Sequence, residues 1–361
     1  MVSGGGVVMK KKILSLLLSL VVLITLAACG SGQETAASAE TKEAAEQETL
    51  KESGMQAEGS KVDLFTKNAR DIPEELVVIS AEYRKPAAQE GTLAKLNYET
   101  WESFSYEQHS QKLNKTAWVY LPYGYDEKQA YNIFYLSHGG WSNEETVLGT
   151  DSQPSELKYA VDHAIQDGRM KPMILVCPTY NNISGRDSWD YSLALQLTDQ
   201  FHNELMNDLI PAVEGRYHTW ADYDTSSENL KATRDHRGFG GFSMGSVNTW
   251  HTFQYCLDYF RYFMPMSGNM DDGAWIDAVV RSSDWTDEDF FIWTATGTED
   301  FAASGFSYQI NSMVNEYADT FHLADNEIDG NVSYRLQEGG THGPEASNQY
   351  TFNGLLWFWN E

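Results

Sequence analysis

The sequence predicts an α/β domain built on a central, mostly parallel sheet with helices on both faces. Short apolar runs typical of buried strands alternate along the chain with longer stretches of helical periodicity, which is the pattern of parallel βα units. Loops rich in glycine and polar residues follow several of these runs directly. In a parallel sheet such loops gather at one edge, where ligands bind.

The segment 237–245 narrows this class to the α/β-hydrolase fold. Residues 237–242 (RGFGGF) can form a short buried strand, and residues 246–260 carry apolar side chains at helical spacing. Between them Gly241, Ser243 and Gly245 make the pattern G-x-S-x-G. Strand, glycine-flanked serine and helix together are the context of a nucleophile elbow, in which the serine hydroxyl points out of the sheet.

Charge and composition limit the function classes. The formal net charge is -27 and the pI is near 4.6, so no basic surface is available to neutralise phosphates and we expect no nucleic-acid partner. The hydrophobic content of 42% is enough to bury a large core. A soluble, acidic, exported protein is the interpretation that fits these numbers.

The N-terminal region predicts export and lipid anchoring. Residues 1–28 contain lysines and then an apolar run that is too short to span a bilayer comfortably, followed by Leu26-Ala-Ala-Cys29. This resembles a bacterial lipobox, which implies cleavage before Cys29 and a lipid on its thiol, at the extracellular face of the membrane. The alternative is an ordinary cleaved signal. Residues 29–61 have little to bury and predict a disordered acidic tether, or else a marginal helix. The folded α/β-hydrolase domain is therefore expected to span residues 62–361.

Along this domain the patterns predict the following elements. Strands are expected at 76–83, 91–106, 116–121, 131–137, 173–176, 237–242, 262–267, 290–295 and 332–336, and helices at 155–167, 193–209 with Pro211 closing it, 246–260 and 352–359. Cys177 and Cys256 fall in a strand and a helix. We interpret them as two buried thiols, although an exported protein could also join them in a disulfide.

The loops after these strands carry the candidate site residues. His138-Gly-Gly-Trp141 follows a strand, and its small residues would let a backbone N–H face a substrate oxygen. A simple glycine-rich turn is the alternative. Tyr180 and Asn181 fall after the next strand, at the same predicted edge.

Ser243, Asp300 and His342 are the candidate catalytic residues, in the chain order that this fold uses. Serine is a poor nucleophile until an imidazole takes its proton, and a carboxylate must hold that imidazole in the correct tautomer. His342 follows the final strand in a glycine-rich loop, although a surface histidine would also fit there. Asp271 and Asp272 are rivals of Asp300. No histidines are spaced as metal ligands, and we expect no metal and no cofactor.

Several stretches together make residues 89–361 similar to carbohydrate esterase family 1, the feruloyl and acetyl-xylan esterases with their esterase D relatives. The matching stretches are QEGTLAKL (89–96), VYLPYGYD (119–126), LSHGG (136–140), DHRGFGGFSMG (235–245), GTED (297–300) and GGTH (339–342). The resemblance implies Ser243 as nucleophile, His342 as base and Asp300 as acid. It also implies the amides of Met244 and Gly140 as oxyanion donors.

The implied function is a serine esterase that removes feruloyl or acetyl groups from xylan. Two departures from the family pattern occur: Thr341 separates the glycine pair from His342, and Trp141 stands where a further glycine is common. Aromatic side chains at Trp141, Tyr180, Trp189 and Trp275, with Asn181, are candidates for substrate contact, although each aromatic could instead belong to the core.

Two other function classes remain open from the sequence. One is an esterase or acyltransferase of the same fold that acts on small acyl esters. The other is a non-catalytic, glycan-binding lipoprotein that has kept only the scaffold, against which the intact Ser, His and Asp set argues.

Overall fold

Eight strands form one sheet in the computed structural model, which describes residues 65–360. The predicted signal segment 1–28, Cys29 and the tether 29–61 lie outside the described residues. The strands are β1 (Thr92–Trp101), β2 (Lys112–Leu121), β3 (Asn132–Ser137), β4 (Met173–Cys177), β5 (Arg237–Phe242), β6 (Tyr262–Met266), β7 (Phe291–Gly297) and β8 (Val332–Gln337).

The sheet order is β1-β2-β4-β3-β5-β6-β7-β8. β2 pairs antiparallel with both β1 and β4, and all pairs from β4 to β8 are parallel. The predicted mostly parallel sheet is therefore confirmed. The carboxyl ends of β3, β4, β5, β7 and β8 meet at one edge, which is the edge where the candidate site residues follow their strands.

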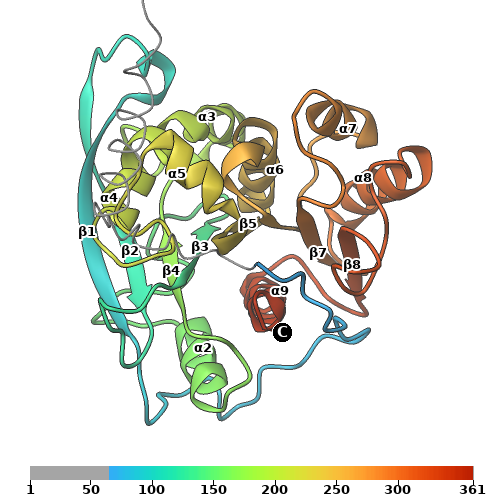
Figure 1. Cartoon of the computed structure of the whole chain (residues 1–361), viewed down its shortest axis with the longest axis horizontal. Coiled ribbons are helices and arrows are strands. Elements are labelled where there is room, and N and C mark those ends of the chain that lie inside the picture. Colours follow the sequence, from blue (N-terminus) through green and yellow to red (C-terminus); the bar gives the residue numbers. More distant parts are fainter. Residues whose placement is uncertain (1–64, 361) are drawn as a thin grey trace, which may run out of the picture. The chain divides into compact units, whose positions relative to one another are not determined.

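Helices cover both faces of this sheet (Figure 1). The α-helices are α2 (Glu156–Gln166), α3 (Tyr191–Glu204), α4 (Ile210–Glu214), α5 (Ser227–Ala232), α6 (Met244–Cys256), α7 (Gly273–Arg281), α8 (Ala303–Glu316) and α9 (Pro344–Trp357). Short 3-10 turns lie at Ser103–Ser105, Asp187–Trp189, Arg234–His236 and Leu257–Tyr259, and a π-helical turn at Leu205–Leu209 joins α3 to α4.

Alternate side chains of β3 show how the two cores are divided. Ile133 and Tyr135 pack with α3, α6, α7 and α8 on one face, while Phe134 and Leu136 pack with α2 and α9 on the other. This period of two is the pleat of a strand that is buried on both faces. It explains why the sequence of β3 is apolar throughout and not alternating.

Two predictions about helix ends are wrong. Pro211 does not close the helix that precedes it, because it occupies the first turn of α4, where its missing N–H is tolerated. The C-terminal helix begins at Pro344, eight residues before the predicted start at 352. Its first half carries polar residues that masked the helical pattern. Helices α7 and α8 were not predicted.

The predicted strand at 76–83 is also wrong. Residues 76–80 form no strand and residues 81–83 lie in a turn, and two amides of the segment pair with helix side chains and not with a neighbouring strand. Val77 N donates to Asn353 Oδ1 at 2.7 Å and Ile79 N donates to Gln349 Oε1 at 3.1 Å, and both acceptors lie on α9. An extended segment that crosses a helix has the same alternation as a strand, so the pattern alone cannot separate the two.

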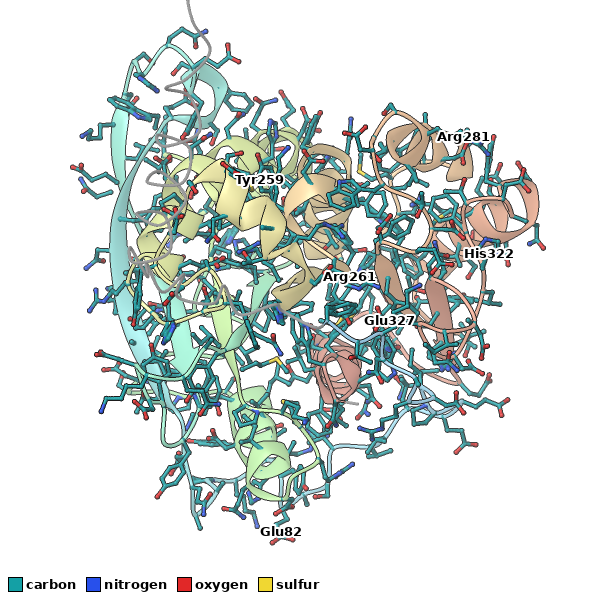
Figure 2. The ribbon with its side chains drawn as sticks, viewed as in Figure 1. Glu82, Tyr259, Arg261, Arg281, His322 and Glu327 are labelled. Carbon is teal, nitrogen blue, oxygen red and sulfur yellow. The ribbon has the colours of Figure 1, made fainter. Side chains whose placement is uncertain are left out.

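A buried ion pair fastens the chain at Asn68, upstream of this segment, to the sheet. Arg261 Nε donates to Glu327 Oε1 at 3.0 Å, and Figure 2 labels both residues. The other carboxylate oxygen of Glu327 accepts from Tyr262 Oη and from Asn68 N. A buried charge of this kind is tolerated because each of its oxygens has hydrogen-bond donors.

Cys177 and Cys256 are buried free thiols, as the sequence indicated. Burial raises the pKa of the Cys177 thiol to about 12, so it stays protonated and unreactive near neutral pH. None of the helices between residues 65 and 360 has both the length and the apolar character needed to cross a membrane.

Candidate active site

Ser243 lies at a sharp turn between β5 and α6. Its backbone has φ 62° and ψ -118°, a conformation that few non-glycine residues adopt. A Cβ on Gly241 or on Gly245 would lie 2.5 or 2.4 Å from Ser137 O. Both positions therefore require glycine, and the tight contact with β3 holds the serine hydroxyl out of the sheet.

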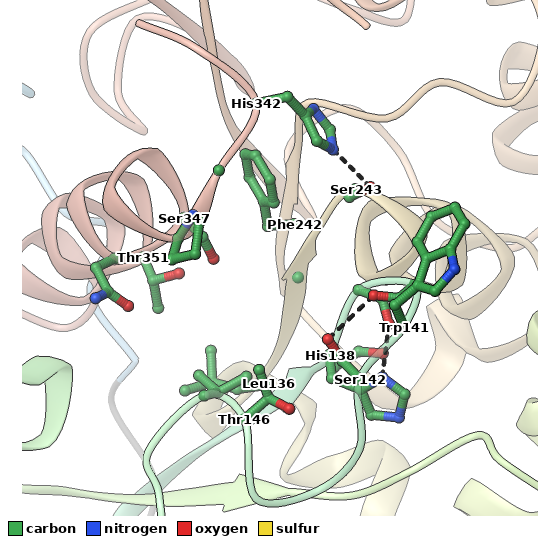
Figure 3. Close-up of a pocket in the computed structure, with 18 of the residues that line it drawn as sticks. Leu136, His138, Trp141, Ser142, Thr146, Phe242, Ser243, His342, Ser347 and Thr351 are labelled. Atoms are coloured by element: carbon green, nitrogen blue, oxygen red, sulfur yellow. Dashed lines mark hydrogen bonds between the residues drawn. The ribbon is translucent and has the colours of Figure 1, made fainter. Parts of the chain in front are cut away.

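His342 and Asp300 complete a hydrogen-bonded chain with Ser243. Ser243 Oγ and His342 Nε2 are 2.8 Å apart (Figure 3), and His342 Nδ1 is 2.8 and 2.9 Å from the two oxygens of Asp300. The Asp300 carboxylate therefore fixes Nδ1 as the donor, which leaves Nε2 free to accept the serine proton. The structure brings the three predicted residues together in spite of the inserted Thr341.

Asp300 is placed by the turn after β7. It is buried, and its Oδ1 also accepts from Ala302 N at 2.7 Å. The rival Asp272 instead caps α7 by accepting from Ala274 N at 2.9 Å, and the other rival, Asp271, is exposed. Of the carboxylates weighed from the sequence, Asp300 is the one that contacts the imidazole.

Two aromatic rings enclose the imidazole of His342. The ring of Phe242 lies 4.6 Å from it and that of Phe301 lies 4.1 Å from it, measured between ring centroids. Phe301 is 82% exposed, although it directly follows the catalytic acid in sequence. Phe301 does not pack in the core, and its exposure is explained by its contact with the ring of His342. The sequence analysis did not identify it.

The loop after β3 is held against Ser243 by buried polar groups. A Cβ on Gly139 would lie 3.6 Å from Ser243 Cβ, so the two backbones are close. Gly139 O accepts from His138 Nδ1 and from Tyr180 Oη, each at 2.7 Å, and His138 Nε2 pairs with Thr179 Oγ1 at 2.8 Å. Burial lowers the pKa of His138 to about 4, so its ring is neutral at working pH and serves as a fixed support.

Tyr180 and Asn181 do not face a ligand, contrary to the prediction that they contact substrate. Tyr180 is 1% exposed and Asn181 is 3% exposed. Asn181 Nδ2 donates to Ser142 O and Gly185 O, and its Oδ1 accepts from Ser188 N. Because both residues lie beneath the loop that follows β3, they position that loop and leave its surface to other residues.

Trp141 does reach the site surface. Its side chain is 65% exposed, its φ is 55°, and its amide N donates to Ser188 O at 2.9 Å. That amide is already occupied, which leaves the amide of Gly140 as the donor on this loop. Met244 is the first residue of α6, and the first N–H groups of a helix have no acceptor within it. The sequence-based assignment of these two amides to the oxyanion stays a prediction.

A cavity of about 270 Å³ opens beside Ser243 and His342. Leu136, Val147 and Phe242 give it apolar walls, and Thr146, Ser347 and Thr351 add hydroxyl groups (Figure 3). Ser347 and Thr351 stand four residues apart on α9 and so share one face of the helix. The sequence analysis began this helix at 352, so it did not identify these two residues as part of the wall.

Trp275 lies away from this cavity. It is on α7 and lines a separate hollow with Tyr255 and Asp258, so its contact with substrate stays a prediction. Within residues 65–360, no group of three or more His, Cys, Asp or Glu side chains is placed to hold a metal ion.

Comparison with known proteins places the chain in a family. The Esterase family model, described as "Putative esterase", matches residues 109–318. The chain is 34% identical over 288 residues to an endo-1,4-beta-xylanase Y of Acetivibrio thermocellus, an alignment that covers 77% of this chain. It is 30% identical over 140 residues, 37% of this chain, to an endo-1,4-beta-xylanase/feruloyl esterase of Xylanibacter ruminicola. The chain spans only 24% and 17% of the length of these two relatives.

Solved structures agree with this assignment. A mutant of the feruloyl esterase module from Clostridium thermocellum, complexed with sinapinate, is 32% identical with a TM-score of 0.68, covering 82% of this chain and 96% of that module. A ferulic acid esterase from Anaeromyces mucronatus shares the fold at 18% identity and a TM-score of 0.56, covering 79% of this chain and 99% of that one. The chain therefore has the α/β-hydrolase fold, belongs to the esterase family and is a homologue of the clostridial feruloyl esterase module.

Proposed function

We propose that the protein is a serine carboxylic-ester hydrolase that removes feruloyl or acetyl groups from xylan. The observation that carries this proposal is the chain of hydrogen bonds from Ser243 through His342 to Asp300 beside an open cavity. Similarity to a feruloyl esterase module and to xylanases supports the substrate class.

The geometry supports acyl transfer through the serine. His342 Nε2 takes the proton of Ser243 as its oxygen attacks the ester carbonyl, and the Asp300 carboxylate stabilises the imidazolium that forms. The predicted amides of Gly140 and Met244 would hold the tetrahedral oxyanion, a donor of this kind contributing about 3 kcal/mol. His342 then gives this proton to the leaving sugar oxygen as the ester C–O bond breaks, and water repeats the sequence on the acyl-enzyme to release the acid.

The cavity favours an aromatic acyl group over acetyl. Its volume of about 270 Å³ and its apolar walls with hydroxyl groups at the far side suit a phenolic ring that carries polar substituents. An acetyl group would leave most of this space unfilled. Feruloyl is therefore the acyl group that we propose first, with acetyl as the competing assignment.

Hydrolysis of methyl ferulate and methyl acetate tests both the reaction and the acyl group, since the two esters share a leaving group. We expect methyl ferulate to have the higher kcat/KM by roughly 100-fold, because burying an aromatic ring contributes about 2–3 kcal/mol. Released acid is measured by chromatography, and the Ser243→Ala variant serves as the blank. Preference for acetate would reject the aromatic assignment. No hydrolysis of either ester, or hydrolysis that survives in the blank, would reject the function.

We also propose that the protein is exported and held at the extracellular face of the membrane by a lipid on Cys29. The lysines, apolar run and Leu26-Ala-Ala-Cys29 sequence support this proposal. Expression in a bacterium fed a labelled fatty acid is expected to label the wild type, and the Cys29→Ser variant is expected to lose the label. Equal labelling of both proteins, or of neither, would count against the anchor.

A further inference from the structure

A second, more open hollow lies beside the catalytic cavity and shares a wall with it. It has a volume of about 640 Å³, and we call it the tryptophan groove. Its lining includes Trp141, Ser142, Thr146, Ser184, Arg186 and Trp189. The catalytic cavity shares three of these lining residues, Trp141, Ser142 and Thr146. Because the two hollows are adjacent, one ligand can occupy both without leaving the protein surface.

Two indole rings in the tryptophan groove are left to solvent. Trp141 is 65% exposed and Trp189 is 53% exposed, and the Arg186 guanidinium lies 5.0 Å from the ring centre of Trp189. Exposed tryptophans are uncommon because their large apolar area costs free energy in water. Two of them on neighbouring walls of one hollow therefore indicate a ligand with flat apolar faces.

Hydrogen bonds between the two walls fix the spacing of these rings. Trp141 N donates to Ser188 O at 2.9 Å, and Ser188 Oγ donates to Ser142 O at 2.7 Å. Asn181, buried beneath, donates to Ser142 O and to Gly185 O. These hydrogen bonds join the loop that carries Trp189 to the loop that carries Trp141. A ligand that contacts both loops therefore loses little binding free energy to ordering them.

We propose that the tryptophan groove binds the sugar chain of the ester substrate, with pyranose rings stacked on Trp189 and Trp141. Stacked sugars present C–H faces to an indole and hydroxyl edges to polar groups, which Arg186 and Ser184 supply. This inference rests on the proposed function. It adds to that function a location for the sugar, which is the alcohol part of the ester. In Figure 3, Trp141 stands on the opposite side of Ser243 from Ser347 and Thr351, which is the arrangement needed to separate alcohol from acyl group.

Charge and shape argue for a neutral polysaccharide. The chain carries a net charge of -27, and Arg186 is the cation among the groove residues, so an anionic polymer would be repelled overall. The groove is open along the surface, which lets a polymer extend beyond it. A neutral polymer with a pyranose backbone, such as xylan, meets both conditions.

The Trp189→Ala variant tests the groove with two substrates of the same acyl group. For a feruloylated arabino-xylo-oligosaccharide we expect kcat/KM to fall about tenfold, mostly through KM, since one lost stacking contact corresponds to about 1.4 kcal/mol. For methyl ferulate, which has no sugar, we expect a change of less than about twofold. Trp189→Phe should recover part of the loss. Tyr123→Ala, an exposed aromatic in the turn after β2, is the matched control and should change neither value.

Binding of xylohexaose, which carries no ester, separates this inference from the esterase function. Tryptophan fluorescence should report binding to the wild type and at least a severalfold weaker affinity in Trp189→Ala. If methyl ferulate is hydrolysed but xylohexaose does not bind, the groove assignment fails and the function stands. If xylohexaose binds through Trp189 but no ester is hydrolysed, the function fails and the groove stands. Equal losses on both esters in Trp189→Ala would overturn the groove assignment.

Discussion

Replacing Ser243 with alanine is expected to lower kcat for methyl ferulate by about 10⁶-fold, with little change in KM. The hydroxyl is the atom that forms the acyl-enzyme, and its 2.8 Å hydrogen bond to His342 Nε2 is the contact that activates it. The variant should fold normally, because Ser243 Oγ has no other hydrogen bond that would be lost within the described part of the chain. Single-turnover and steady-state rates, measured at high enzyme concentration, check this value.

The variants Ser243→Ala, His342→Ala and the double variant together test whether the residues act as one unit. If His342 serves only to activate Ser243, each single variant should lose about as much activity as the double variant. Any remaining rate above that of the free ester would come from the oxyanion amides and from binding. A double variant whose loss equals the product of the two single losses would mean that the residues act independently, contrary to the geometry.

The catalytic residues could be predicted because their signals are local. The elbow needs glycine at 241 and 245 for a steric reason that is written into the sequence, since a Cβ at either position would meet Ser137 O. Asp300 and His342 each follow a strand whose apolar run is unmistakable, and the topology of a parallel sheet then brings the strand ends together. Thr341 did not disturb this result, since His342 still contacts both Ser243 and Asp300.

The ligand-facing residues could not be predicted in the same way. Tyr180, Asn181 and Trp141 all follow strands at the correct edge, but only the packing of one loop over another decides which are covered. Tyr180 and Asn181 are buried because the loop carrying Trp141 lies over them and uses their polar atoms. Trp275 was proposed from residue type alone, and residue type does not distinguish the two sides of a helix layer.

The part of the cavity wall that α9 forms shows a second limit of prediction from the sequence. Ser347 and Thr351 reach the cavity because α9 begins at Pro344, whereas its most apolar residues, from which the helix was predicted, lie in its second half. The N-terminal segment 65–90 covers that half, and its amides bond to Gln349 and Asn353. Polar residues that serve a buried neighbour look like solvent-facing residues in the sequence, so the contact that explains them must be seen in three dimensions.

Replacing Asp300 with asparagine is expected to lower kcat by about 10⁴-fold while leaving KM and stability nearly unchanged. The side chains have the same shape, and an asparagine Oδ1 can still accept from Ala302 N, so the turn after β7 should be kept. What changes is the proton on His342. An amide NH₂ placed at Nδ1 favours the tautomer whose proton is on Nε2, and that nitrogen then cannot accept the proton of Ser243. The imidazolium formed during attack also loses its counter-charge.

Asp272→Asn is the matched control for this change. Asp272 was the alternative acid, and it caps α7 through Ala274 N, a role that asparagine fills equally well. Its variant should therefore keep kcat within about twofold and unfold at the same urea concentration as the wild type. The same substitution is thus expected to lower kcat strongly at Asp300 and hardly at all at Asp272. Comparing the two kcat values therefore identifies the catalytic acid directly. A large loss in Asp272→Asn with a small one in Asp300→Asn would require His342 to leave its contact with Asp300 when substrate binds.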